Sequence, residues 1–370
     1  MRRLAPLALV FLLALGYPSA PLWAQEQVEP SRELKQPDVA AALRWLANKQ
    51  GADGSWGAKD KLALTGMSGL ALLASGSTAE HGPFAQQIRR AIRFVLTCQK
   101  DDGMAFKHGS SGYSAIHNHG YALLFLTQAY GEAGALDKDL QYAIKQGVKA
   151  TIRAQYFQPK ASDGGFGYFL VPGRAPTQWK HMWNVDEAST TISQIQALRG
   201  ARNAGFPVPK RALERAGAYL AKCVHPPTGG FVYSNGRRRI SFIEGSNRPT
   251  FAITAASTAV LHALGNYDGP LVDGGITYIQ AFRPPSRKKV PFYYYAHYYA
   301  AQVMYMKGGA QGKKWLGAVR AELAERQRSD GKWGADPEDS LAPTDSEVLN
   351  TAWALQVCQI ESGFLPIHER

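Results

Sequence analysis

Two kinds of hydrophobic pattern alternate along the chain from about residue 38 to its end. Segments of the first kind are amphipathic: in residues 140–152 apolar side chains recur at helical spacing opposite lysines, and residues 315–323 repeat this among charged side chains. Segments of the second kind are apolar or small nearly all round, as in 62–74, 120–129 and 251–264. The first pattern predicts helices with one solvent-exposed face, and the second predicts helices buried on every side. We therefore expect outer helices that alternate with inner ones.

A short turn motif recurs between the two kinds of helix. Residues 50–56 read QGADGSW and residues 327–333 read QRSDGKW, so Gln, Gly and Trp keep one spacing. Weaker copies place an aromatic residue after glycine, and one copy has lost its glycine; the six markers are Gly54, Gly103, Gly165, Gly230, Pro291 and Gly331. Glycine permits the tight turn, and the aromatic residue covers the helix ends. Six helical hairpins that cannot bury their own faces predict a closed double ring and an all-α fold.

The motif resembles the QW repeat of squalene cyclases, and the GGF copies at 164–166 and 229–231 resemble those of protein prenyltransferase β subunits. This resemblance extends from about Asp38 to the end of the chain. It implies an α/α toroid of the terpenoid cyclase-like superfamily, with an isoprenoid as the expected ligand of a central cavity. Because folds of this kind carry several chemistries, function has to be argued from the site.

The N-terminal residues predict export. Arg2 and Arg3 precede an apolar run over residues 4–15, and Ala24 offers a cleavage point before Gln25. We interpret residues 1–24 as a signal peptide, 25–37 as an N-terminal extension and 38–370 as a single toroid domain. The expected location is periplasmic or extracellular.

Charge and cysteine content limit the partners. The net charge of +13 would attract anions or an acidic membrane surface. Basic runs at 237–239 and 287–289 fall in predicted loops without the signature of a nucleic-acid module, so we expect no nucleic-acid partner. Three cysteines at distant positions offer neither a disulfide framework nor a metal knuckle.

The best candidate for chemistry lies where a predicted inner helix begins. Long loops lead into the inner helices, so their polar N-terminal residues should gather at one mouth of the ring, near positive helix-dipole ends. Residues 184–189 read NVDEAS and resemble the DxDDTA acid motif of the cyclases, with Asp186 at the proton-donating position. Asn184 replaces the first aspartate and Glu187 the last. The alternative role for these residues is helix capping.

Other polar and aromatic residues are expected at the same mouth as substrate-binding groups: His117, His119, Arg248, Tyr294, Tyr295, His297 and Asp345. Aromatic side chains there would stabilise carbocations by cation–π attraction. The prenyltransferase zinc site needs an Asp-x-Cys pair, which residues 250–253 lack, although His297 resembles its histidine position. We therefore predict no metal and no cofactor; a metal held by His117 and His119 with nearby carboxylates is the alternative.

Three functions are compatible with these residues. The first is a metal-independent enzyme of the class II terpene cyclase kind, with Asp186 as the acid and Asn184 and Glu187 as its partners. The second is a non-catalytic exported binding or scaffold protein. The third is an enzyme acting on acidic polysaccharide, in which Arg248, His297 and a tyrosine would bind carboxylates and transfer protons.

Overall fold

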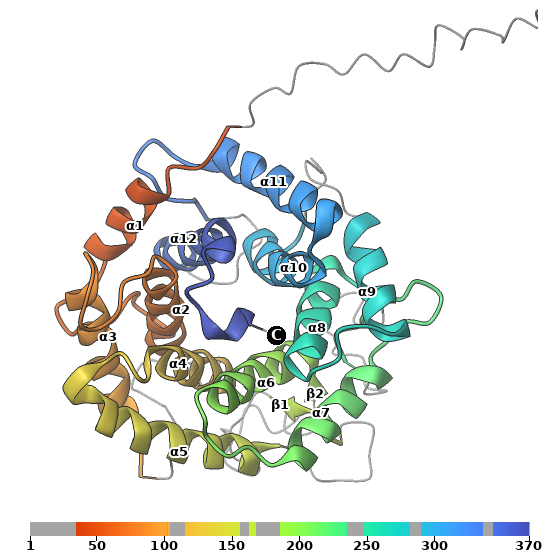
Figure 1. The fold of residues 1–370 in the computed structure, drawn as a ribbon, viewed down its shortest axis with the longest axis horizontal. Helices are drawn as coiled ribbons and strands as arrows, with labels where there is room; N and C mark the ends of the chain where they lie inside the picture. The colour runs from red at the N-terminus through yellow and green to blue at the C-terminus, as the bar shows by residue number, and fades with distance from the viewer. Residues whose placement is uncertain are drawn as a thin grey trace, which may run out of the picture. The chain divides into compact units, whose positions relative to one another are not determined.

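The computed structural model describes residues 35–101, 103, 115–155, 163–167, 186–234, 248–281, 290–335 and 343–369, with only the backbone at 186, 187 and 343. Twelve α-helices in these ranges alternate between an inner and an outer ring (Figure 1). The inner helices are α2 (Lys61–Leu73), α4 (Ala115–Ala129), α6 (Ala188–Asn203), α8 (Phe251–Ala263), α10 (Tyr293–Lys307) and α12 (Pro343–Gln359). The outer helices are α1 (Val39–Asn48), α3 (Ala85–Cys98), α5 (Asp137–Ala154), α7 (Lys210–Lys222), α9 (Pro270–Ala281) and α11 (Gly309–Arg326).

The inner helices form a closed ring. Each contacts the next along the chain, and α12 contacts α2. Their side chains are buried nearly all round: twelve of the thirteen residues of α2 are buried, whereas α3 buries only one stripe. The predicted all-α toroid, with inner and outer helices in alternation, is confirmed. None of the helices in the described part of the chain is long and apolar enough to cross a membrane.

The turn motif joins neighbouring hairpins through its glutamine. In the first copy, Gln50 Nε2 donates to the carbonyl oxygen of Gly54 at 3.0 Å and to that of Gln87, in α3, at 2.9 Å. Gln99 and Gln155 bond in the same way to α5 and α7. One side-chain amide thus joins the turn to a backbone carbonyl of the next outer helix.

The last copy of the motif closes the ring. Gln327 Nε2 donates to the carbonyl oxygens of Gly331 (2.8 Å) and Asp38 (2.9 Å), and Gln327 Oε1 accepts from the Asp38 amide (2.7 Å). Gly331 packs directly on α1: a Cβ there would lie 2.7 Å from the carbonyl carbon of Ala41. The two ends of the helical array are therefore joined by the contact that repeats within it.

The motif aromatics anchor the inner helices. Trp56 and Trp333 are fully buried, and their indole Nε1 atoms donate to the carbonyl oxygens of Leu46 (2.7 Å) and Leu323 (2.9 Å). The backbone amides of the motif aromatics donate to inner-helix threonines; the pairs are Trp56 with Thr65, Phe166 with Thr191, Phe231 with Thr254 and Trp333 with Thr351. This confirms that the aromatic residue covers the helix ends.

Two of the predicted turn glycines are off by one residue. Gly164, not Gly165, accepts the motif glutamine and has positive φ, and Gly229, not Gly230, has positive φ in the next copy. In the copy without glycine, Phe292 itself adopts φ of 55°. The GGF pattern fixes the turn only to within two adjacent glycines, because either could take this conformation.

A minimal two-stranded sheet and the C-terminal residues complete the architecture. Strands β1 (Phe166–Gly167) and β2 (Asp186–Glu187) pair antiparallel, with Phe166 opposite Glu187 and Gly167 opposite Asp186. After α12, the short 3₁₀ helices η5 (Ile360–Ser362) and η6 (Pro366–His368) lead the chain into the middle of the ring (Figure 1). A third, η3 (Gly134–Leu136), precedes α5.

Candidate functional site

Side-chain bonds between successive inner helices place their N-terminal ends at one mouth of the ring. Asn118 of α4 bonds Asp60, which precedes α2; His117 of α4 contacts Ser189 of α6; and Phe251 of α8 packs edge-on against His297 of α10. We call this end of the ring the N-terminal mouth. Residues at the starts of neighbouring inner helices therefore contact one another at this end of the ring.

Asp60 is a buried carboxyl group at this mouth. Only 8% of the residue is exposed, and Oδ1 accepts from Asn118 Nδ2 at 2.9 Å, while Asn118 Oδ1 accepts from the Ala63 amide. Burial, reinforced by the nearby charge of Asp345, raises the pKa of Asp60, and the bond from Asn118 opposes this only in part. Asp60 therefore holds a proton more readily than an ordinary aspartate.

Asp60 also has a strained backbone, with φ of 45° and ψ of 34°. Aspartate tolerates this left-handed region better than most side chains do, but the conformation still costs about 1 kcal/mol. A strained backbone conformation at a buried acid with a raised pKa is typical of functional sites.

Asp345 anchors the loop that carries Asp60. Its Oδ1 accepts from the Ala58 amide at 2.8 Å and its Oδ2 from the Lys59 amide at 3.0 Å, and the residue is 2% exposed. The structure thus places this predicted binding residue at the N-terminal mouth. Because both carboxylate oxygens are bonded to backbone, its evident task is to position residues 58–60.

His117 is a neutral base at the same mouth. Its Nε2 lies 3.1 Å from Ser189 Oγ, and its ring is tilted against Tyr121 at 6.3 Å between centroids. Burial lowers the pKa of His117 to about 4, so the imidazole is uncharged at neutral pH. It can accept a proton from a strong acid.

Aromatic side chains meet across the ring. Tyr121 of α4 lies close enough to Tyr298 and Tyr299, on the opposite helix α10, to raise the pKa of both, in addition to the larger effect of burial. Tyr299 packs edge-on against Tyr295 at 4.8 Å, and Tyr295 packs against Trp353 of α12 at 5.6 Å. We call these five residues the lumen aromatics.

Two predicted histidines point away from the lumen. His119 Nε2 bonds Thr151 Oγ1 of the outer helix α5 at 2.9 Å. His297 donates from Nδ1 to the Tyr293 carbonyl and stacks on Trp315 of the outer helix α11 at 6.0 Å. Both rings therefore belong to the packing between inner and outer helices, and His297 does not face the lumen aromatics.

The other predicted site residues also lie in different surroundings. Tyr294 is buried against Tyr293 at 5.0 Å, Tyr295 belongs to the lumen aromatics, and Arg248 is exposed just before α8. Asp186 and Glu187 precede α6, with their backbone paired in β2. Asn184 lies outside the described residues.

Sequence reasoning missed Asp60. It directly precedes the first inner helix, and Asp345 lies in the first turn of the last inner helix. An aspartate at the start of an inner helix, shortly after a turn motif, was therefore a usable signal. Among the described residues, no three His, Cys, Asp or Glu side chains are grouped so as to hold a metal ion.

Buried histidines make the fold sensitive to acid. Burial lowers the pKa of His297 and of His368 to about 4, below the ordinary value of 6.5. A depressed histidine pKa means that the unfolded chain takes up the proton first, so stability is lost as pH falls from 6.5 toward 4. We expect each histidine to cost about 2 kcal/mol at pH 5 relative to pH 7.

Urea unfolding at pH 7, 6 and 5 checks this prediction, with His297→Leu as the test variant. The variant should show a weaker pH dependence than the unmodified chain. An equal pH dependence would mean that His297 is not a source of the acid sensitivity.

Comparison with known proteins identifies the fold. No family model matches the chain, and no curated protein matches it. An alpha-1,6-mannanase from Salegentibacter sp. superposes with a TM-score of 0.60 at 10% identity, over 87% of this chain and 98% of its own. The type II terpene cyclase MstE from Scytonema, solved with geranylgeranyl dihydroxybenzoate, gives 0.57 at 15% identity, over 88% and 97%.

A sugar epimerase from a ruminal bacterium gives a TM-score of 0.55 at 11% identity, over 85% of this chain and 95% of its own. These proteins share the fold of this chain over nearly their whole length, although sequence identity is only 10–15%. The α/α toroid is thus shown, and the chemistry has to come from the site.

Proposed function

We propose that this protein is an exported, metal-independent enzyme that protonates a carbon–carbon double bond of an isoprenoid at the N-terminal mouth. One observation carries the proposal: a buried carboxyl group with a raised pKa, Asp60, belongs to the same inner ring as the lumen aromatics. Alkene protonation needs an acid that keeps its proton in an apolar place, and the resulting cation needs electron-rich ring faces.

The reaction can be written with these residues. The O–H bond of Asp60 breaks as its proton forms a C–H bond at the alkene, leaving a tertiary carbocation. A second double bond of the same substrate attacks the cation and closes a ring. The final cation loses a proton to a neutral base, for which His117 is suited, and the product is an isomer of the substrate.

Two further observations support this reading. Asn118 donates to Asp60 and so holds the carboxyl group in place, as a positioned acid requires. The type II terpene cyclase among the structural neighbours was solved with geranylgeranyl dihydroxybenzoate as substrate and with merosterolic acid A as product.

A polysaccharide substrate is the second candidate. The observation in its favour is the adjacent carboxyl pair Asp186–Glu187 before α6. The mannanase among the neighbours is described as inactive when two consecutive aspartates are replaced by asparagine, and that variant was solved with alpha-1,6-mannotriose. A positively charged chain would favour an acidic glycan.

One experiment separates the candidates. The mature protein is incubated with geranylgeranyl dihydroxybenzoate, with alpha-1,6-mannotriose and with a uronate oligomer, and products are followed by chromatography and mass spectrometry. A new compound with the mass of the isoprenoid and one ring more supports the proposal. Cleavage of a glycan supports the second candidate. If none of the three compounds is converted and none raises the Tm of the protein, a scaffold role is favoured.

Export is part of the proposal and predicts a defined mature chain. Expressed in its full length in a bacterial host, the protein should be found outside the cytoplasm with Gln25 as its first residue. N-terminal sequencing of the periplasmic fraction checks this, and replacing Ala24 with a bulky residue should block processing. A cytoplasmic, unprocessed chain would contradict the prediction.

A further inference from the structure

The opposite end of the ring holds a second polar site. Residues 360–369, which we call the C-terminal segment, close over the C-terminal ends of α4 and α6. The Ile367 amide donates to Gln128 Oε1 at 2.8 Å, and Asn203 Nδ2 donates to the Pro366 carbonyl at 2.9 Å. Between this segment and the helices lies a small hollow, part of it open to solvent.

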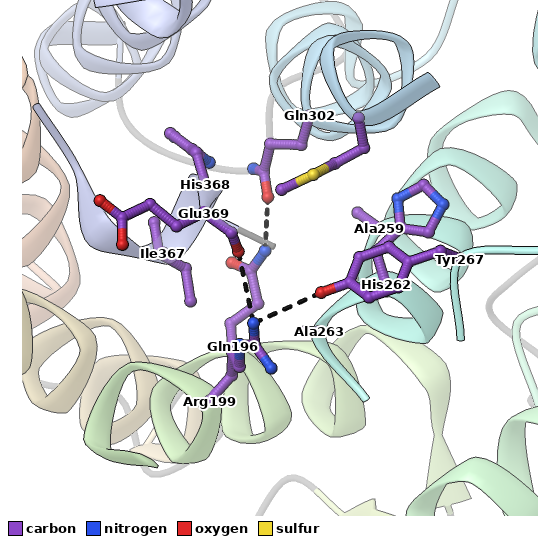
Figure 2. A pocket seen from close by; sticks show the side chains of 11 residues that line it. Gln196, Arg199, Ala259, His262, Ala263, Tyr267, Gln302, Ile367, His368 and Glu369 are labelled. Carbon is purple, nitrogen blue, oxygen red and sulfur yellow. Dashed lines mark hydrogen bonds between the residues drawn. The ribbon is translucent and has the colours of Figure 1, made fainter. Parts of the chain in front are cut away.

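Arg199 is the charged group of this hollow. The residue is 8% exposed, and its terminal nitrogen donates to the Tyr267 hydroxyl (3.4 Å) and the Glu369 carbonyl (3.3 Å). Among the described residues, its Nε has no hydrogen-bond partner. Figure 2 shows the guanidinium directed into the hollow, with the Glu369 carboxylate turned away. Among the ion pairs of the described residues, none includes Arg199.

The surroundings of Arg199 make it unfavourable for this buried cation to lack an anionic partner. The C-terminal dipole of α6 offsets part of its charge, but Arg202, one turn away, adds a second positive charge. A buried guanidinium without an anionic partner is costly, and its two existing bonds are long and go to neutral oxygens. Arginine binds carboxylates through paired N–H donors, and the Nε and a terminal nitrogen form such a pair.

Other polar side chains complete the lining. Gln196 Nε2 donates to Gln302 Oε1 at 2.8 Å, which joins α6 to α10 across the hollow (Figure 2). His262 stacks on Tyr267 at 5.7 Å. Burial keeps the pKa of His368 at about 4, so this ring adds no charge at neutral pH. Arg199 is the arginine that lines the hollow.

We propose that Arg199 is the centre of a carboxylate-binding site at the C-terminal end of the ring, separate from the N-terminal mouth. The carboxylate is that of a small free ligand. Such a ligand neutralises Arg199 and ties the C-terminal segment to α6.

Thermal unfolding of the mature chain in sodium acetate, against sodium chloride at equal ionic strength, tests the site. The matched variants are Arg199→Gln and Arg202→Gln, which remove the same charge from the same helix, the first buried and the second exposed. Acetate should raise the Tm of the unmodified chain and of Arg202→Gln, and its apparent affinity for Arg199→Gln should be weaker by about tenfold or more.

Should Arg199→Gln fail to fold, acetate titration of Arg199→Lys replaces it. The proposal is overturned if acetate does not raise the Tm of the unmodified chain, or if it raises the Tm of the unmodified chain and of Arg199→Gln equally and with the same apparent affinity.

Discussion

Replacing Gly331 with alanine is expected to lower the free energy of unfolding by about 3 kcal/mol. Gly331 has φ of 93°, and a Cβ would lie 2.7 Å from the Ala41 carbonyl carbon, closer than real Cβ contacts come. The cost combines an unfavourable backbone conformation with the displacement of α1 from the last turn motif. Since Gln327 bonds Asp38 across the same junction, the substitution opens the ring where its two ends meet.

Gly363→Ala supplies the control. Gly363 also has positive φ, at 71°, but nothing lies within 4 Å of its added Cβ. That variant should lose only the conformational part, about 1 kcal/mol. Urea unfolding of both variants measures the difference. Equal losses would show that the contact between Gly331 and α1 does not contribute to closing the ring.

The toroid could be predicted because its evidence is local and repeated. In four copies the glutamine bonds a turn glycine within about ten residues, and it also bonds the chain in or just before the next outer helix; these are Gln50, Gln99, Gln155 and Gln327. A pattern present six times also fixes the topology, because each hairpin needs its neighbours to cover its inner helix. The sequence could not predict which of two adjacent glycines takes the turn position, as at Gly164, because the two are equivalent in the motif.

The site could be predicted only as a region. Residues 293–299 read YYYAHYY, aromatic at almost every position, so periodicity gives no indication which face of α10 turns inward. The structure turns Tyr295 and Tyr299, four residues apart, inward and His297 outward. A shift of two residues, about 200° of rotation, would have exchanged them.

The acid could not be identified from its neighbours in sequence. What raises the pKa of Asp60 is burial at the junction of three inner helices and the charge of Asp345, which follows it by 285 residues. Asn118, which holds it, comes from a third helix. The resemblance to the cyclase acid motif directed attention to Asp186, whose side chain the structure does not describe.

Asp60→Asn is expected to reduce the rate of isoprenoid isomerisation by about a thousandfold, the usual contribution of a positioned acid. Asparagine keeps the acceptor for Asn118 and tolerates the left-handed backbone, but has no acidic proton. For the unmodified enzyme, the rate should also fall as pH rises through the raised pKa of Asp60, because the ionised carboxylate cannot donate.

The same substitution should not destabilise the fold. A raised aspartate pKa contributes stability that is present below the unfolded pKa and is lost as pH rises through the folded pKa. The ionised form of Asp60 therefore lowers the stability of the fold. The variant should therefore unfold at an equal or higher temperature than the unmodified chain at pH 7, with the advantage shrinking as pH falls. Loss of activity together with gained stability separates an acid from a structural aspartate.

Asp53→Asn is the matched control, because Asp53 stands in the turn just before α2, is exposed and pairs with Lys61 at 3.0 Å. Hydrogen bonds from Ser55 and Lys61 outweigh partial burial and lower the pKa of Asp53 to about 2, so it is ionised and cannot serve as a proton donor near neutral pH. Its variant should keep nearly full activity. If Asp60→Asn kept it as well while Asp186→Asn abolished it, the proton would come from the start of α6, and the raised pKa of Asp60 would be a consequence of ring closure alone.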